Sequence, residues 1–153
     1  VFAIDLHTGY GERGRLHLFS MTPEDNEEKK RLESLFEDYT IDWGENEDFY
    51  LVNGELLNYL KMLFADKDYM AMPFEFGTLD TQTSLGSIRA LNNLMIENQG
   101  YQFGYLSEND EIKAKQRFRE GFYPSSAAWR SKVIEDAREL FLYTIKKYNR
   151  TVQ

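Results

Sequence analysis

The sequence predicts an α/β fold with a mixed, largely parallel sheet that is flanked by helices. Short apolar segments of alternating polarity are separated by longer segments in which apolar side chains recur at helical spacing. Hydrophobic residues make up 42% of the 153 residues and aromatic residues 15%, which is enough for a substantial core. We therefore expect residues 1–153 to form a single domain.

The N-terminal segment predicts a strand over residues 1–8. Side chains on a strand alternate between two faces, and the polar ones on this strand are Asp5 and His7. Gly9 breaks the alternation, and residues 15–20 predict a second, shorter strand.

The middle of the chain predicts two helices and one strand. The segment Thr22-Pro23-Glu24-Asp25 is typical of a helix start, and apolar side chains keep helical spacing to about residue 38. A polar loop at residues 40–48 is the best candidate for an exposed insertion. Residues 49–52 predict a short strand, and residues 55–65 predict a second helix.

A further strand is predicted over residues 69–76. Its even-numbered side chains are all apolar, whereas Glu75 belongs to the other face. Pro73 cannot donate a ladder hydrogen bond, so we expect a bulge or a local sheet edge at this residue.

Three helices complete the expected order of elements. The first is capped by Thr83 or Ser84 and is expected to stop at Gly100. The second covers residues 107–120, and the third covers residues 126–148.

Composition excludes several classes of function. The net charge of −8, without a basic stripe, argues against nucleic-acid binding, because such proteins need cations to meet phosphates. No apolar stretch is long enough for a membrane span, so we expect no membrane association. The absence of cysteine excludes disulfides, thiolate metal ligands and a cysteine nucleophile, and it fits a cytoplasmic location.

The chain begins with an apolar strand at Val1, without a methionine or a charged leader. This start predicts that the 153 residues are the C-terminal part of a larger catalytic domain. Removal of strands that flank the first strand would leave an unpaired sheet edge, so we also expect possible self-association through that edge.

Two polar residues with catalytic chemistry follow apolar strands, each shortly before a glycine: His7 and Glu75. Ligand sites of open α/β sheets form beyond the carboxyl ends of strands, so an imidazole and a carboxylate could converge there. By pattern alone, a strand-end histidine is more often structural, and a strand-end carboxylate pairs with a base about as often as it catalyses. Asp5 either supports the imidazole or is a sheet-end acid satisfied by Arg13 or Arg15.

Other catalytic signatures are missing from the sequence. There is no dinucleotide-binding or phosphate-loop pattern and no nucleophile elbow. The second histidine, His17, has no metal-ligand spacing to the first, and it is best interpreted as a surface residue of a strand.

Four segments in order resemble the zinc carboxypeptidase superfamily, which includes carboxypeptidase A-like enzymes and the succinylglutamate desuccinylase and aspartoacylase branch. The likeness is nearest to a group of uncharacterised bacterial carboxypeptidase-like proteins. The segments are Asp5-Leu6-His7-Thr8-Gly9, Phe74-Glu75-Phe76-Gly77-Thr78, Ile88-Arg89-Ala90-Leu91-Asn92-Asn93 and Phe122-Tyr123-Pro124-Ser125-Ser126-Ala127-Ala128-Trp129-Arg130.

The resemblance implies the C-terminal portion of a zinc-carboxypeptidase-like (phosphorylase/hydrolase-like) fold and a zinc-dependent hydrolase of amide bonds. It implies that His7 is one ligand of a single zinc ion and that Glu75 is the general base. A peptide or an N-acyl amino acid would be the substrate of such a metallocarboxypeptidase or deacylase. Possible substrate-binding residues are Arg13, Arg15 and Arg89, while Asp5 would support the imidazole.

The chain departs from the family at its zinc ligands. The superfamily takes two ligands from an upstream His-x-x-Glu motif, whereas here His7 is followed by Tyr10 and His17 by Ser20 at the corresponding spacing. We therefore expect these 153 residues alone to lack catalytic zinc and to be inactive. The alternative is a non-catalytic α/β domain that binds a peptide or a protein partner and has lost the metal site.

Overall fold

The computed structural model describes residues 1–20, 26–43 and 55–151. The chain divides into two compact units, each with its own internal packing. Unit 1 comprises residues 1–7, 17–74 and 137–153, and unit 2 comprises residues 8–16 and 75–136.

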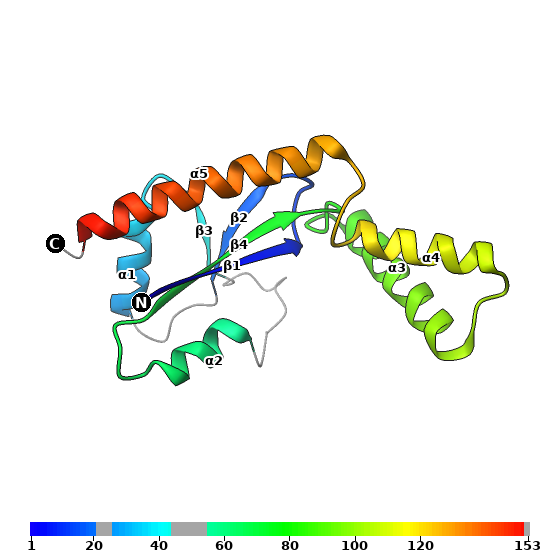
Figure 1. Ribbon diagram of the computed structural model, residues 1–153, viewed down its shortest axis with the longest axis horizontal. Helices are drawn as coiled ribbons and strands as arrows, with labels where there is room; N and C mark the ends of the chain where they lie inside the picture. Colours follow the sequence, from blue (N-terminus) through cyan, green and yellow to red (C-terminus); the bar gives the residue numbers. More distant parts are fainter. Residues whose placement is uncertain (21–25, 44–54, 152–153) are drawn as a thin grey trace. The chain divides into compact units, whose positions relative to one another are not determined.

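The sheet has four strands in the order β1-β4-β2-β3. Their bounds are Phe2–Gly9 for β1, Leu16–Phe19 for β2, Ile41–Asp42 for β3 and Met70–Gly77 for β4. Strands β2 and β3 pair in parallel with Leu18 opposite Ile41, and the arrows of β1 and β4 point the same way (Figure 1). The mixed, largely parallel sheet expected from the sequence is confirmed.

The pairing of β3 corrects the expected insertion at residues 40–48. Ile41 and Asp42 form the last strand of the sheet, and Ser20 N donates to the carbonyl oxygen of Asp42 at 2.9 Å. Thus at least the start of this segment is sheet. The strand expected at residues 49–52 and the helix start at residues 22–25 lie outside the described residues.

The order of strands also places Pro73. Strand β4 lies between β1 and β2, so Pro73 belongs to an inner strand rather than to one at the margin of the sheet. Strand β1 is an edge strand of the sheet formed by the described residues, and the sequence predicts a sheet edge at this strand.

Helix α1 (Asn26–Leu35) covers one face of the sheet in unit 1. Leu32 and the following Phe36 are almost completely buried, and the Phe36 ring packs edge-on against Phe74 of β4 at 6.2 Å between centroids. The Phe36 ring also lies 6.1 Å from Phe2 of β1. Apolar burial on this scale is worth about 2 kcal/mol for each large side chain.

Helix α2 (Leu56–Leu63) packs through the residue that precedes β4. The Tyr69 hydroxyl donates to the Leu57 carbonyl oxygen at 3.2 Å, and its ring stacks on Phe64 at 5.9 Å. Tyr69 directly precedes β4 and lies an odd number of residues before Phe74. Because side chains of an extended chain alternate, the two side chains point to opposite faces. Helices α1 and α2 therefore contact different faces of the sheet.

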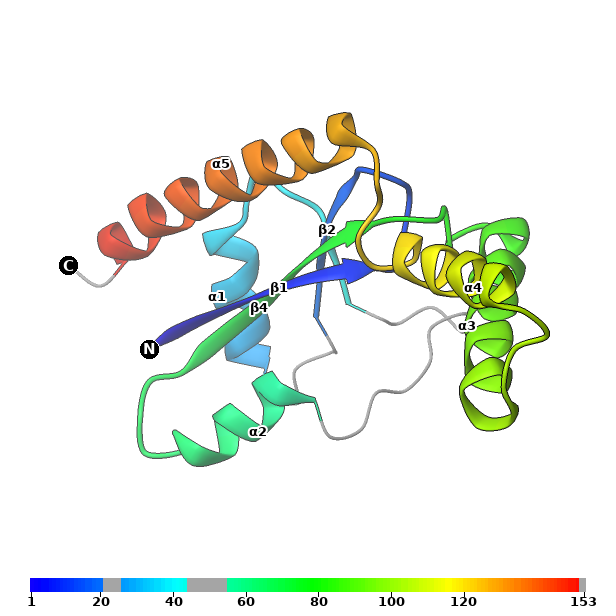
Figure 2. The ribbon, with the colours of Figure 1, turned by 45° about the vertical axis from the view of Figure 1, so that its right-hand side comes forward.

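Unit 2 contains α3 (Ser84–Phe103) and α4 (Glu108–Glu120), which lie side by side (Figures 1 and 2). Both begin at a side-chain cap, and for α3 the cap is Thr83, one of the two residues that the sequence predicts. Thr83 Oγ1 accepts from Gly86 N at 3.1 Å, and Ser107 Oγ accepts from Asp110 N at 3.2 Å.

The C-terminus of α3 differs from the expectation that Gly100 stops the helix. The helix continues to Phe103, and Gly104, with φ +88°, follows it. Gly100 is buried because Tyr105 folds back on it: a Cβ at Gly100 would lie 2.0 Å from the Tyr105 ring. The glycine marks a close packing contact rather than the helix end.

Helix α5 (Ala127–Thr151) is the longest helix and contributes to both units. Trp129 is buried in unit 2 and Leu140 in unit 1, whereas Phe141 is half exposed. Leu140 rather than Phe141 therefore belongs to the core. Among the helices of residues 1–20, 26–43 and 55–151, none has the length and hydrophobicity needed to cross a bilayer.

Candidate functional site

His7 lies near the end of β1 in unit 1, and its imidazole faces a carboxylate. Nδ1 of His7 lies 3.0 Å from Oδ2 of Asp5. The His7 side chain is 55% exposed, whereas the Asp5 side chain is only 19% exposed. Residues i and i+2 share one face of a strand, which explains why they meet. Of the two readings of Asp5, the structure supports the one in which it contacts the imidazole.

Glu55 is a second carboxylate close enough to His7 and Asp5 to interact with their charges. Burial and the negative charge of Asp5 raise the pKa of Glu55, and the charge of His7 opposes that shift. Glu55 immediately precedes α2 and accepts a hydrogen bond from Asn58 Nδ2 at 3.1 Å. No spacing in the sequence connects Glu55 with His7, because α2 brings it there through tertiary packing.

Glu75 belongs to unit 2 and is held by the loop that follows β1. Its Oε1 accepts a hydrogen bond from Tyr10 N at 2.9 Å. A Cβ at Gly9 would lie 3.7 Å from the same oxygen, so the glycine leaves this side of the carboxylate open. A charge-assisted hydrogen bond from a backbone N–H orients the carboxylate at this strand end.

The glycine after Glu75 permits a close backbone approach, as its place in the sequence predicts. A Cβ at Gly77 would lie 2.0 Å from the carbonyl oxygen of Glu12. The Gly77 carbonyl oxygen accepts from Gly14 N and from Trp129 Nε1, both at 2.9 Å. These contacts fix the strand end that carries Glu75 against the loop.

Thr78 adds a second set of contacts at the same strand end. It is completely buried, and its hydroxyl oxygen lies 2.9 Å from the Gly9 carbonyl oxygen and 2.7 Å from that of Gly121. The Thr8 hydroxyl donates to the Phe122 carbonyl oxygen at 2.6 Å. The end of β1, the residue that follows β4 and the two residues that follow α4 are thus connected by hydrogen bonds within unit 2.

The three arginines proposed for substrate binding have different surroundings. Arg13 donates from Nη1 to the Thr78 carbonyl oxygen at 2.8 Å, so it stabilises the loop. Arg15 is exposed and pairs with Glu12 at 3.3 Å. Arg89 lies on the exposed surface of α3. Their role in binding a substrate remains a prediction for each of them.

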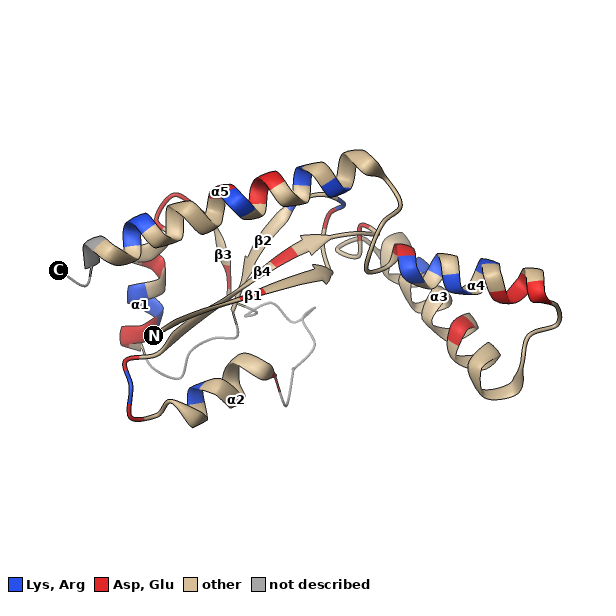
Figure 3. Cartoon of the chain, viewed as in Figure 1, with Lys and Arg blue, Asp and Glu red and all other residues tan. Residues whose placement is uncertain are grey.

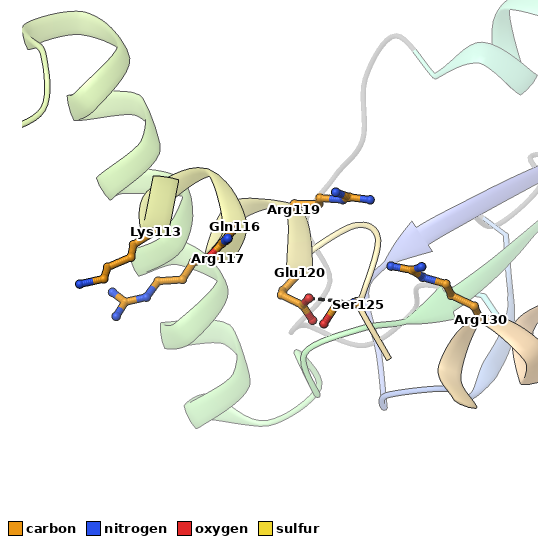
Figure 4. A pocket seen from close by; sticks show the side chains of 7 residues that line it. All are labelled: Lys113, Gln116, Arg117, Arg119, Glu120, Ser125 and Arg130. Carbon is orange, nitrogen blue, oxygen red and sulfur yellow. Dashed lines mark hydrogen bonds between the residues drawn. The ribbon is translucent and has the colours of Figure 1, made fainter. Parts of the chain in front are cut away.

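Unit 2 also contains a basic pocket, on α4 and the start of α5, which was not predicted from the sequence. Figure 3 shows acidic residues in the first turn and at the C-terminal end of α4, with basic residues between them. The pocket has a volume of about 600 Å³ (Figure 4). Its charged lining consists of Lys113, Arg117, Arg119, Glu120 and Arg130.

The donor set for a metal ion is incomplete in the part of the chain that the structure describes. Within the described residues, no group of three or more histidine, aspartate or glutamate side chains could hold a metal ion. His7 with Asp5 fits one ligand and its supporting carboxylate, which is the usual arrangement at zinc sites. These residues do not fit a complete zinc centre by themselves.

The family comparison covers most of the chain. The model of a family described as "Protein of unknown function (DUF2817)" matches residues 1–136. Comparison with the curated proteins and with the solved structures gives no match.

Proposed function

The chain belongs to the DUF2817 family, and we propose that it is the C-terminal part of a zinc-dependent amide hydrolase. In this proposal His7 is one zinc ligand and Glu75 is the general base. The substrate is a peptide or an N-acyl amino acid, as the resemblance to zinc carboxypeptidases implies.

The contact between His7 and Asp5 is the observation that carries the proposal. Because Nδ1 faces the Asp5 carboxylate at 3.0 Å, that carboxylate stabilises a proton on Nδ1. The Nε2 lone pair is then left for a metal ion, and the carboxylate fixes the orientation of the ring. The exposure of more than half of the His7 side chain gives an ion access to it. The nearby Glu55 adds negative charge that favours a cation at this place.

Glu75 has the features of a positioned base. The Tyr10 N–H binds one carboxylate oxygen at 2.9 Å and orients the group that would accept a proton from water. The fixed strand end restrains the carboxylate, and Gly9 leaves space beside it. After accepting the proton, the same carboxyl group would deliver it to the leaving amine.

Zinc supplies Lewis-acid polarisation of the substrate carbonyl and activation of water when it is bound. The proposal needs two further ligands from a part of the protein that precedes Val1, because the superfamily that the chain resembles takes them from an upstream His-x-x-Glu motif. Among the described residues, no group of three candidate ligands could hold the ion. We accordingly propose that residues 1–153 alone have no hydrolase activity.

Metal removal from the full-length protein tests this function. We expect hydrolysis of short peptides or N-acyl amino acids to fall by at least ~10²-fold after chelation and to return on addition of zinc. Metal analysis before and after chelation provides the control. Undiminished hydrolysis by a protein shown to be free of metal would rule out the proposal. Saturable peptide binding without hydrolysis in the zinc-loaded protein would favour the non-catalytic alternative.

A further inference from the structure

The basic pocket of unit 2 combines cationic side chains from two helices. Lys113 and Arg117 lie one turn apart on α4, and Arg130 belongs to α5. Figure 4 shows Lys113 and Arg117 on one side of Glu120, and Arg119 with Arg130 on the other. The pocket volume of about 600 Å³ suits a small molecule.

Among the described residues, the cations of this pocket differ from neighbouring lysines in forming no ion pair with a carboxylate within 4 Å. On the same two helices, Lys115 pairs with Glu111 at 2.5 Å and Lys132 pairs with Asp136 at 2.6 Å. Within the described part of the chain, no ion pair joins any of the four pocket cations to an acid. In a chain of net charge −8, unpaired cations gathered in one pocket form a local region of positive potential.

The two arginines on one side are held in place by an aromatic ring. The guanidinium carbon of Arg130 lies 4.3 Å from the centre of the Tyr123 ring, and that of Arg119 lies 5.3 Å from it. Arg130 Nε also donates to the Pro124 carbonyl oxygen at 2.9 Å. These contacts use one N–H of Arg130 and leave its other donors for a ligand. Preorganisation of this kind reduces the entropy lost on binding.

Glu120 is the one carboxylate in the lining, and its charge is already engaged. Its Oε1 accepts from Ser125 N at 2.8 Å, and its Oε2 lies 3.9 Å from Arg13 Nη2. The hydrogen bond to Ser125, with the charges of Arg13 and Arg130, lowers the pKa of Glu120. Glu120 therefore stays ionised and braces the loop between α4 and α5.

We propose that this pocket binds the phosphate group of a small molecule. Four cations and one carboxylate leave a formal charge of +3 around the cavity. A phosphate dianion balances more of this charge than a single carboxylate does. It also presents three terminal oxygens to guanidinium donors that come from both helices. The helix dipole of α4 explains cations in its last turn, but it does not explain Arg130 on another helix.

Titration of the 153-residue chain with inorganic phosphate tests the site. Binding is measured by calorimetry or by NMR shifts at constant ionic strength, with acetate as the singly charged comparison. We expect saturable binding of phosphate and at least ~10-fold weaker binding of acetate, because charge-assisted contacts scale with ligand charge. The proposal does not depend on hydrolase activity, so a failed zinc experiment leaves it standing.

Two lysines of α4 provide a matched pair of variants. Lys113 and Lys115 are both exposed, but only Lys113 lines the pocket. Lys113→Gln should raise the Kd for phosphate by ~3–10-fold, whereas Lys115→Gln should change it by less than ~2-fold. Arg130→Gln should weaken binding further, and the Lys113 result remains decisive if that variant folds poorly.

Three outcomes would overturn the site. The first is the absence of saturable phosphate binding to the folded chain. The second is equal weakening by Lys113→Gln and Lys115→Gln, which would indicate a general charge effect. The third is acetate binding as tightly as phosphate, which would reject the assignment to a doubly charged ligand.

Discussion

Replacement of Glu75 by glutamine is expected to lower kcat/KM for amide hydrolysis by the full-length protein by ~10²–10⁴-fold. Glutamine retains a side-chain oxygen that can accept from Tyr10 N, so the loop that holds residue 75 should keep its geometry. It cannot take a proton from water at neutral pH. The loss should therefore appear in kcat, with little change in thermal stability or zinc content.

The matched control for Glu75→Gln is Glu12→Gln. Glu12 is an exposed carboxylate of the same loop, where it pairs with Arg15 at 3.3 Å. The control removes the same charge from the same region, and an exposed pair of this kind contributes at most about 1 kcal/mol. If both variants lose activity equally, or if Glu75→Gln keeps full activity, Glu75 is not the base.

Gly77→Ala is expected to lower the free energy of unfolding by about 3 kcal/mol. The added Cβ would lie 2.0 Å from the Glu12 carbonyl oxygen, so backbone must move rather than a flexible side chain. That movement would strain the bonds from Gly14 N and Trp129 Nε1 to the Gly77 carbonyl oxygen. Urea unfolding, followed by tryptophan fluorescence and circular dichroism, measures the loss.

Gly104→Ala separates steric overlap from backbone conformation. Gly104 has a φ of +88°, but a Cβ there would meet no atom within 4 Å. Its replacement should cost about 1–3 kcal/mol from backbone conformation alone, because φ +88° with ψ 162° is a combination that essentially only glycine adopts. A Gly77→Ala variant as stable as the wild-type protein would contradict the close approach at the end of β4.

The sequence predicts those helices and strands in which apolar side chains recur at a regular spacing. Strands β1 and β4 were identifiable because their residues alternate over eight positions, and α3 because Thr83 or Ser84 can cap its start. Strand β3 has only two residues, which is too few for an alternating pattern of apolar and polar side chains. It is a strand because it pairs with β2. Gly100 was misassigned because the contact with Tyr105, rather than local conformation, requires a glycine there.

The residues of the candidate site also fall into two groups: those that local spacing predicts and those that only tertiary packing brings together. Asp5 and His7 were predictable as a pair because they share one face of a strand. Glu55 was missed because it reaches its place through the packing of α2. The basic pocket was missed for a related reason: Lys113 and Arg117 are one turn apart, but Arg130 joins them from another helix.

The role of His7 as a zinc ligand is tested most directly by the zinc content of the full-length protein, measured for two histidine variants. The chain offers a matched pair, since His7 and His17 are its two histidines. We expect His7→Gln to lose at least ~10-fold in zinc affinity and His17→Gln to retain wild-type affinity, with both variants folded by circular dichroism. Undiminished zinc binding by the folded His7→Gln variant would contradict the account.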